Sequence, residues 1–505
     1  MKEDTIINRY KGFKPLQRKQ KLDSIKLSSI SSSEFYEKYV RTRTPVVIDD
    51  ILNEFKENGN YLFQQFQPEN IVDFLKKDDN NSPVLQIEKK FQGGFGSGIA
   101  KTKMGFQDFI EALYVGNEDL YLTTQYYNEE SHENNNIEES SDENEDENQG
   151  ILDFNDFQSY EPNSSGNNVI NDDDDDDDDD DDSLDDFDFD IENMHDDFDE
   201  MNNNLLISKE FEKDPLYLLE ARTRLFQLFQ TPLTYSLQHE ISLPIRPSFL
   251  NLVSQQINLW VGSSSSGIKS FSLDKLDIKK DDLGFGKLLP TGGTSSGLHH
   301  DHADNLYIPI TGTKRFTIFA PSEAENLYTV GDVDIIYESG VIDYKTNNNA
   351  PSWQKVRSDG AIIEINLSNC NENASKKLDP PSFSKIPPIL LHLENISNHK
   401  NLVKAASTKY PRFFKAIPVE VTLKPGQMLF LPCGWFHEVS SSGEERKDGL
   451  SIYHPSNNIH VAINYWFFPP DSHSFNQPYN DKFWENDFKR TLMSYNEHLK
   501  KRFKI

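Results

Sequence analysis

Apolar and polar positions along the chain predict a few amphipathic helices and many short strands. Apolar residues at helical spacing predict a helix over Phe35 to Val40 with Ser33 as its N-cap. Further helices are predicted over residues 105–115 and 215–229. Strands are predicted over residues 45–48, 119–126, 256–262, 305–311, 314–320, 419–423, 428–432 and 460–468.

The predicted strands are short and are separated by Gly, Pro and Asn, a spacing that favours antiparallel pairing over alternating βαβ units. We therefore expect a mainly β protein with flanking helices, built as a sandwich or barrel. No internal repeat of fixed period is visible.

Composition changes abruptly at residue 128. Residues 128–203 are rich in Asn, Ser, Glu and Asp, and Asp172 to Asp182 is an unbroken acidic run. Such a segment has too few apolar residues to form a core, so we interpret it as a disordered insertion. Residues 128–208 hold 33 of the 83 acidic side chains and no Lys or Arg. The net charge of -32 is thus a local property, because the remainder has 51 basic and 50 acidic side chains.

Only two cysteines occur, without the paired spacing of a zinc site or the density of a disulfide scaffold. The amino-terminal residues contain no apolar signal segment, and no apolar stretch is long enough to cross a bilayer. We expect an intracellular protein, nuclear or cytoplasmic, with no membrane association.

Four segments are predicted. Residues 1–127 form an amino-terminal helical and strand part, and residues 128–203 the acidic insertion. Residues 204–470 form the β core, with loop insertions at 263–293 and 331–412, and residues 471–505 form a carboxy-terminal helical segment. The last segment is predicted either to form a homodimer contact or to pack back on its own chain.

Three histidines and two aspartates lie within residues 299–304. In an extended backbone, residues two apart share a face, so His299 and Asp301 can bind one metal ion together. A third ligand from elsewhere would complete a two-His, one-carboxylate set, which leaves open positions on Fe(II) for a chelating co-substrate and O2. The alternative pair, His300 with His302, would suit zinc or copper.

The surrounding sequence resembles the Jumonji-C (JmjC) family of cupin-like oxygenases. The run SSGLHHDHADNLYIPITGTKRFTIFAPSEAENLY resembles the family's central strand pair, and PGQMLFLPCGWFHEVSSSG resembles the segment that supplies the distal histidine. Further family positions are matched, in the family's order along the chain, by TPVVIDD, YLTTQY and HVAINYWFFPP. The resemblance implies a double-stranded β-helix core, of the jelly-roll or cupin type.

The resemblance also implies the site. His299, Asp301 and His437 would hold Fe(II) and form the catalytic centre. His454 and His460 compete with His437 but lack its Gly-Trp-Phe-His context. Lys314 would bind the distal carboxylate of 2-oxoglutarate. Further co-substrate contacts would come from Ser296, Tyr121, Asn305 and Asn464.

The implied activity is an Fe(II)-, 2-oxoglutarate- and O2-dependent dioxygenase. The spacing of Lys314 resembles the protein-hydroxylase branch, so we expect hydroxylation of a protein side chain, with histone N-methyl-lysine demethylation as the alternative. A cupin-like binding protein without turnover is a second alternative. Two interpretations of the acidic insertion stay open: a solvated low-complexity insert without function, which is the preferred one, or a segment that attracts a basic protein or peptide partner, such as a histone or ribosomal protein. Nucleic-acid binding is not expected.

Overall fold

The computed structural model describes most of the chain outside the acidic segment. The described residues are 6–18, 20–50, 55–57, 60–76, 82–125, 215–239, 242–264, 283, 285–290, 293–345, 354–365, 379–396, 399–442 and 458–502. Residues 149–220 separate as a second compact unit, of which only residues 215–220 are described. The expected insertion at 128–203 therefore lies outside the described residues.

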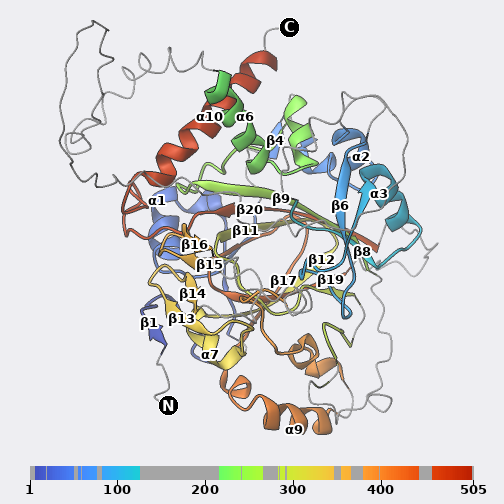
Figure 1. Cartoon of the computed structure of the whole chain (residues 1–505), viewed down its shortest axis with the longest axis vertical. Helices are drawn as coiled ribbons and strands as arrows, with labels where there is room; N and C mark the ends of the chain where they lie inside the picture. Colours follow the sequence, from blue (N-terminus) through green and yellow to red (C-terminus); the bar gives the residue numbers. More distant parts are fainter. Residues whose placement is uncertain are drawn as a thin grey trace, which may run out of the picture. The chain divides into compact units, whose positions relative to one another are not determined.

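Two β-sheets form the core of the first unit, and three strands of the larger sheet, β11, β20 and β9, lie side by side (Figure 1). The larger sheet has the order β2 (Asp23–Ile25), β3 (Val46–Ile48), β18 (Met428–Leu431), β11 (Asp304–Thr311), β20 (Ile459–Phe467), β9 (Ser254–Ser263), β8 (Leu120–Leu122), β6 (Val84–Lys89) and β7 (Lys101–Gly105). The smaller sheet has the order β10 (Thr294–Ser295), β19 (Phe436–Ser442), β12 (Thr313–Phe319) and β17 (Val419–Leu423).

The two sheets pack face to face across a shared apolar cluster. Tyr307 and Ala462 of the larger sheet meet Phe316, Ile318 and Val439 of the smaller one. The outer face of the larger sheet is apolar too, because alternate residues of β9, β11 and β20 join the main hydrophobic core. The expected jelly-roll fold, mainly β with flanking helices, is confirmed.

Most of the predicted elements are present, with boundaries that differ by a few residues. The predicted amino-terminal helix begins earlier than expected, because Ser31 is the N-cap in place of Ser33 and forms a capping box with Glu34. The helices are α1 (Ser32–Phe35), which continues as a π-helical turn, α2 (Ile71–Phe74), α3 (Phe106–Tyr114), α6 (Pro215–Leu228), α7 (Ala324–Leu327), α9 (Lys400–Lys409) and α10 (Phe483–Arg502).

Residues 331–412, expected to be a loop insertion, contain more regular structure than their polar composition suggests. They hold β13 (Val333–Ile336), β14 (Ile342–Tyr344), β15 (Gln354–Val356), β16 (Ile362–Ile365) and α9, while β1 (Ile7–Asn8) pairs with β13. Ile336, Ile389 and Leu402 of this interval are buried in a second hydrophobic cluster with Phe436 of β19. The interval thus supplies a part of the core that borders the smaller sheet.

Helix α10 covers its own chain. Trp484 stacks on Phe468 with ring centroids 3.4 Å apart, and Tyr495 stacks on Phe229 at 6.1 Å. Packing back is therefore one role of the carboxy-terminal segment. No described helix combines the length and the apolar composition needed to span a bilayer.

The amino-terminal part is joined to the β core by a buried ion pair. Arg43 and Asp304 are 3% and 0% exposed, and Arg43 Nη1 donates to Asp304 Oδ2 at 2.9 Å. Asp304 also accepts from the backbone N–H of Cys433, while the backbone carbonyl of Arg43 accepts from the indole N–H of Trp435. The pair thus connects the segment after α1 to both β11 and the turn before β19.

Loss of this pair should destabilise the fold. Asp304→Ala would leave the Arg43 guanidinium buried without its counter-ion, and we expect the free energy of unfolding to fall by about 3–5 kcal/mol in a urea titration. The control is Glu338→Ala, which breaks the exposed pair between Lys11 and Glu338 and should cost less than about 1 kcal/mol. Equal losses in the two variants would contradict the anchoring role of Asp304.

Candidate metal and co-substrate site

Two backbone hydrogen bonds bring the three expected metal ligands together. His299, in the extended segment before β11, donates its backbone N–H to His437 O at 3.0 Å, and His437 N donates back to His299 O at 2.6 Å. The imidazole centroids lie 4.4 Å apart. Asp301 Oδ1 is 3.9 Å from His299 Nε2, and Asp301 Oδ2 is 3.6 Å from His437 Nε2. One ligand atom from each residue lies within 4.8 Å of the others, a set we name the metal triad.

The hydrogen bonds of the two imidazoles orient them for metal binding. His299 Nδ1 lies 3.0 Å from the backbone carbonyl of Gly297, and His437 Nδ1 lies 3.0 Å from that of Trp435. A carbonyl only accepts, so each Nδ1 carries the proton and each Nε2 lone pair is left for a metal ion. Two imidazole nitrogens and one carboxylate oxygen are the donor set that suits Fe(II).

Burial is the main cause of the pKa shifts of His299 and Asp301. It holds the pKa of His299 well below its usual value, with the nearby His437 as the second cause, and this favours the neutral, ligating imidazole. Burial raises the pKa of Asp301, opposed by attraction to His437 and His302. A cation placed between these three groups would relieve the cost of burying the carboxylate.

The neighbouring histidines do not point at the metal triad. His300 Nε2 bonds to the phenol oxygen of Tyr344, and His302 Nε2 lies 3.0 Å from the carbonyl of Ile342. The alternative pair, His300 with His302, is therefore occupied by contacts with β14. Of the other competitors for the third ligand position, His454 lies outside the described residues.

The segment after β16 forms one wall beside the metal triad. Phe383 stacks on the His299 ring with centroids 4.7 Å apart and an interplanar angle of 10°. The ammonium of Lys287 lies 4.6 Å from the centroid of the Phe383 ring. Lys287 also donates to the carbonyl of Phe95 at 3.0 Å. The His299 imidazole is thus held from both its Nδ1 atom and its ring face.

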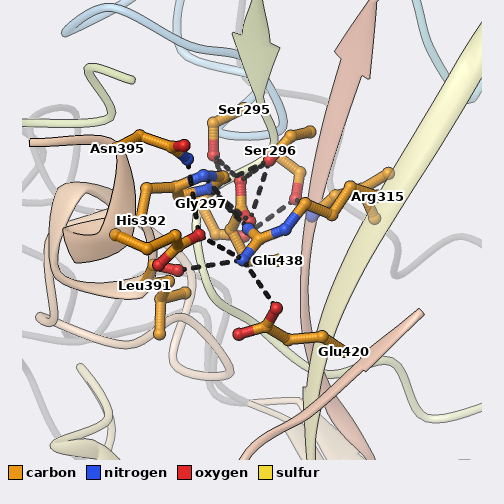
Figure 2. A network of polar contacts seen from close by, with 12 residues as sticks. Ser295, Ser296, Gly297, Arg315, Leu391, His392, Asn395, Glu420 and Glu438 are labelled. Atoms are coloured by element: carbon orange, nitrogen blue, oxygen red, sulfur yellow. Dashed lines mark hydrogen bonds and ion pairs between the residues drawn. The ribbon is translucent and has the colours of Figure 1, made fainter. Parts of the chain in front are cut away.

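Behind His437, the other face of β19 carries a buried polar network. Figure 2 shows Glu438 meeting Ser295 and His392, with Arg315 alongside. Ser295 Oγ donates to Glu438 at 2.6 Å, and His392 Nε2 lies 3.2 Å from Glu438. Arg315 donates to the carbonyl of Leu391 at 3.1 Å. These contacts attach β10 and residues 391–392 to the strand that carries His437.

A second group of polar side chains surrounds a buried ammonium group on β12. Lys314 is 0% exposed, and its Nζ lies 3.2 Å from Tyr121 Oη, 2.7 Å from Ser441 Oγ and 3.1 Å from His460 Nδ1. We name these four residues the Lys314 cluster. No carboxylate of the described residues pairs with Lys314, and burial lowers its pKa to about 7. A buried cation without a counter-ion is the local charge that an anionic ligand would complement.

The other titratable members of the Lys314 cluster are neutral. Burial, and then the nearby Lys314, hold the pKa of His460 well below its usual value. Burial raises the pKa of Tyr121 far above the neutral range. Lys314 is therefore the member of this cluster whose charge changes near pH 7.

The structure brings together some of the expected co-substrate residues and separates others. Tyr121 lies with Lys314 as expected. Ser296 does not: its hydroxyl donates to the carbonyl of Gly297 and accepts from the backbone N–H of Val439, so it serves the backbone. Asn464 Nδ2 donates to Asn305 Oδ1 at 3.1 Å, which places the two amides side by side on the inner face of the larger sheet.

Ser441 and His460 are the residues that sequence reasoning did not assign to this cluster. His460 was considered only as a metal ligand. Strand periodicity was the available signal, because residues two apart in a strand share a face. Ser441 follows His437 by four positions in β19, and His460 precedes Asn464 by four in β20.

The fold and the metal triad define a class of protein: a double-stranded β-helix that presents a two-His, one-carboxylate group from its inner face. Sequence comparison agrees. The profile of the cupin-like domain matches residues 32–473. The chain belongs to this family and is of the JmjC type.

Curated relatives of the chain carry JmjC names. "JmjC domain-containing protein 4" of Schizosaccharomyces pombe is 25% identical over 94% of this chain and 91% of its own length. Human "Bifunctional peptidase and (3S)-lysyl hydroxylase JMJD7" is 23% identical over 34% of this chain and 37% of its own length. "Lysine-specific demethylase JMJ32" of Arabidopsis thaliana is 25% identical over 35% and 39%.

Metal binding should depend on the metal triad. We expect His299→Ala to weaken anaerobic Fe(II) or Mn(II) binding by at least roughly 100-fold in isothermal titration calorimetry, because one of the three proposed ligands is lost. His302→Ala is the matched control, because its imidazole faces Ile342 and its loss should change the affinity little. Retention of full affinity by His299→Ala would refute the site.

Proposed function

We propose that this protein is an Fe(II)- and 2-oxoglutarate-dependent dioxygenase that hydroxylates a side chain of a protein substrate. The observation that carries the proposal is the pairing of two sites inside one sandwich. The metal triad offers the donor set for Fe(II), and the Lys314 cluster offers a buried cation that has no carboxylate partner among the described residues.

The strand β19 contributes one residue to each of the two sites, His437 to the metal triad and Ser441 to the Lys314 cluster. His437 and Ser441 lie four residues apart on one face of this strand, a separation of about 13 Å between their Cα atoms at strand rise. Both side chains extend inward from that line. Their arrangement suits a short dicarboxylic co-substrate that binds metal at one end and an ammonium group at the other.

When bound, Fe(II) with O2 and 2-oxoglutarate would supply the oxidation of a substrate C–H bond to C–OH, coupled to conversion of 2-oxoglutarate to succinate and CO2. The residues of this chain have supporting tasks. The carbonyls of Gly297 and Trp435 hold the two imidazoles in the ligating tautomer. Lys314 orients the co-substrate through its distal carboxylate, and Phe383 covers one face of His299 and excludes water there.

A second candidate is demethylation of N-methyl-lysine, favoured by the similarity to a protein named as a lysine-specific demethylase. The same site would serve, because hydroxylation of an N-methyl carbon releases formaldehyde. The two reactions differ in product: methylated histone peptides would yield formaldehyde, and a hydroxylated peptide would gain one oxygen atom. A binding protein without turnover is less consistent with a site that keeps all three metal ligands and Lys314.

The activity test is release of succinate from 2-oxoglutarate by the purified full chain with Fe(II) and ascorbate. We expect release by the wild type and loss of release in His299→Ala. Lys314→Ala should raise the KM for 2-oxoglutarate at least roughly tenfold, because a charge-assisted contact is lost, while Fe(II) affinity changes little. Equal succinate yields from wild type and His299→Ala would refute the proposed function.

The KM for 2-oxoglutarate should also depend on pH. Burial places the pKa of Lys314 at about 7, and the protonated form binds the carboxylate, so affinity falls as pH rises through that value. We expect KM to increase roughly tenfold between pH 6 and pH 8 at saturating Fe(II). Lys314→Arg is the control, because a guanidinium stays charged over this range and should give a flat profile. A profile of the wild type as flat as that of the arginine variant would contradict the role of Lys314.

A further inference from the structure

Strands β9 and β20 carry six buried side-chain polar atoms without a hydrogen-bond partner in the described part of the chain, and three of them lie on neighbouring inward positions of the larger sheet. These three are Gln256 Oε1 and Asn258 Oδ1 on β9, and the indole Nε1 of Trp466 on β20. Gln256 and Asn258 are 9% and 1% exposed. Gln256 lies directly opposite Trp466 in the sheet register. Buried polar atoms are normally paired, so three on one face need an explanation.

The indole N–H of Trp260 can only donate a hydrogen bond, and this determines which side-chain atom of Asn258 has no partner. The indole N–H of Trp260 donates to Asn464 Oδ1 at 2.8 Å, so the amide of Asn464 has a defined orientation. Asn258 then donates its own Nδ2 to the same oxygen at 3.1 Å. Its Oδ1 is left as a free acceptor. The face therefore presents two acceptors, on Gln256 and Asn258, and one donor, on Trp466.

The sheet register places these three residues away from the Lys314 cluster and toward the end of β11 that follows Asp301 of the metal triad. Along β20 the inward residues run from His460, in the Lys314 cluster, to Trp466. Along β19 they run from Ser441, in the same cluster, to His437 of the metal triad. Trp466 is also directly opposite Asn305, which follows Asp301 by four residues. A substrate atom presented to the metal from this face would pass these groups after the co-substrate has filled the Lys314 end.

We propose that Gln256, Asn258 and Trp466 form the subsite that binds an amide group of the protein substrate next to its target carbon. An amide offers N–H donors for the oxygens of Gln256 and Asn258, and its carbonyl accepts from the Trp466 indole. The inference rests on the proposed function and names the substrate chemistry of that same site. A side-chain carboxamide of Asn or Gln has two N–H groups and one carbonyl and can pair all three atoms, whereas a main-chain peptide bond has one N–H and pairs the Trp466 indole and one of the two oxygens.

The same groups disfavour an ammonium group at this position. A lysine ammonium has donors but no acceptor, so the Trp466 N–H would stay unpaired. Its charge would also need a carboxylate, and the inward residues of β9 and β20 from Gln256 to Trp260 and from His460 to Trp466 include none. A neutral carboxamide satisfies all three atoms without burying a charge.

The test uses the full chain with peptide libraries in which one central position is Asn, Gln, Lys or norleucine and the flanking positions are degenerate. The readout is the ratio of succinate release with library to release without it. We expect the Asn or Gln library to stimulate the wild type most. Trp466→Phe and Gln256→Leu should each lower that stimulation roughly five- to tenfold, because one buried hydrogen bond is lost.

Matched controls separate this effect from general damage. Trp484→Phe removes another buried, unpaired indole N–H, on α10 and in a separate apolar cluster with Phe468. Gln86→Leu repeats the glutamine change at an exposed position of β6 in the same sheet. Both controls should keep the stimulation ratio of the wild type, and near-ultraviolet circular dichroism checks that all four variants fold.

Each outcome has a defined meaning. Equal stimulation by all libraries, lowered by Trp466→Phe in each, supports the subsite and assigns the amide to the substrate main chain. Three outcomes would overturn the subsite while the proposed function stands. The wild type could prefer the Lys library, or no library could stimulate it. The third outcome is that Trp466→Phe and Gln256→Leu keep the stimulation ratios of their controls. If the wild type releases no succinate either with or without a library, the proposed function itself is refuted, and the subsite with it.

Discussion

The exchange of backbone hydrogen bonds between His299 and His437 is the contact on which the site depends. It joins two residues that are 138 positions apart in the sequence and brings two separate strand ends together in the metal triad. Each residue supplies its partner with both a donor and an acceptor, so the two backbones cannot separate without breaking main-chain pairing. The geometry of the metal triad is therefore a property of sheet closure more than of side-chain choice.

The elements around this contact stabilise it from the outside. Glu438 uses the opposite face of β19 to hold Ser295 and His392, and so attaches both the approach to His299 and the 331–412 interval to the same strand. The buried pair of Arg43 with Asp304 attaches the amino-terminal segment at the start of β11. Charged groups are costly to bury singly, and here they are buried in pairs wherever they serve the fold.

The space between the two sheets follows a different rule, and this difference supports the proposed function. Lys314 is buried without a carboxylate partner among the described residues, and Gln256 and Trp466 carry unpaired polar atoms on the inner face of the larger sheet. The unpaired charge of Lys314 and the unpaired atoms of Gln256 and Trp466 therefore suit a site that binds an anion at one end and a polar substrate at the other, as we propose.

The sequence and its family resemblance predicted the class of fold, eight of the thirteen strands of the two core sheets and the three residues that we propose as metal ligands. The strands follow from local periodicity, and the proposed ligands follow from motifs whose residue types are rare in combination. The strand β19 was not among the predicted strands, since its Ser-rich end lacks the apolar alternation of a typical strand. Only the tertiary structure placed Ser441 and His460 beside Lys314, moved Ser296 to a backbone role, and showed that residues 331–412 contribute to the core. The physical reason is that a local pattern specifies which face a side chain takes, whereas the partner across the cavity is decided by which strands meet when the two sheets close.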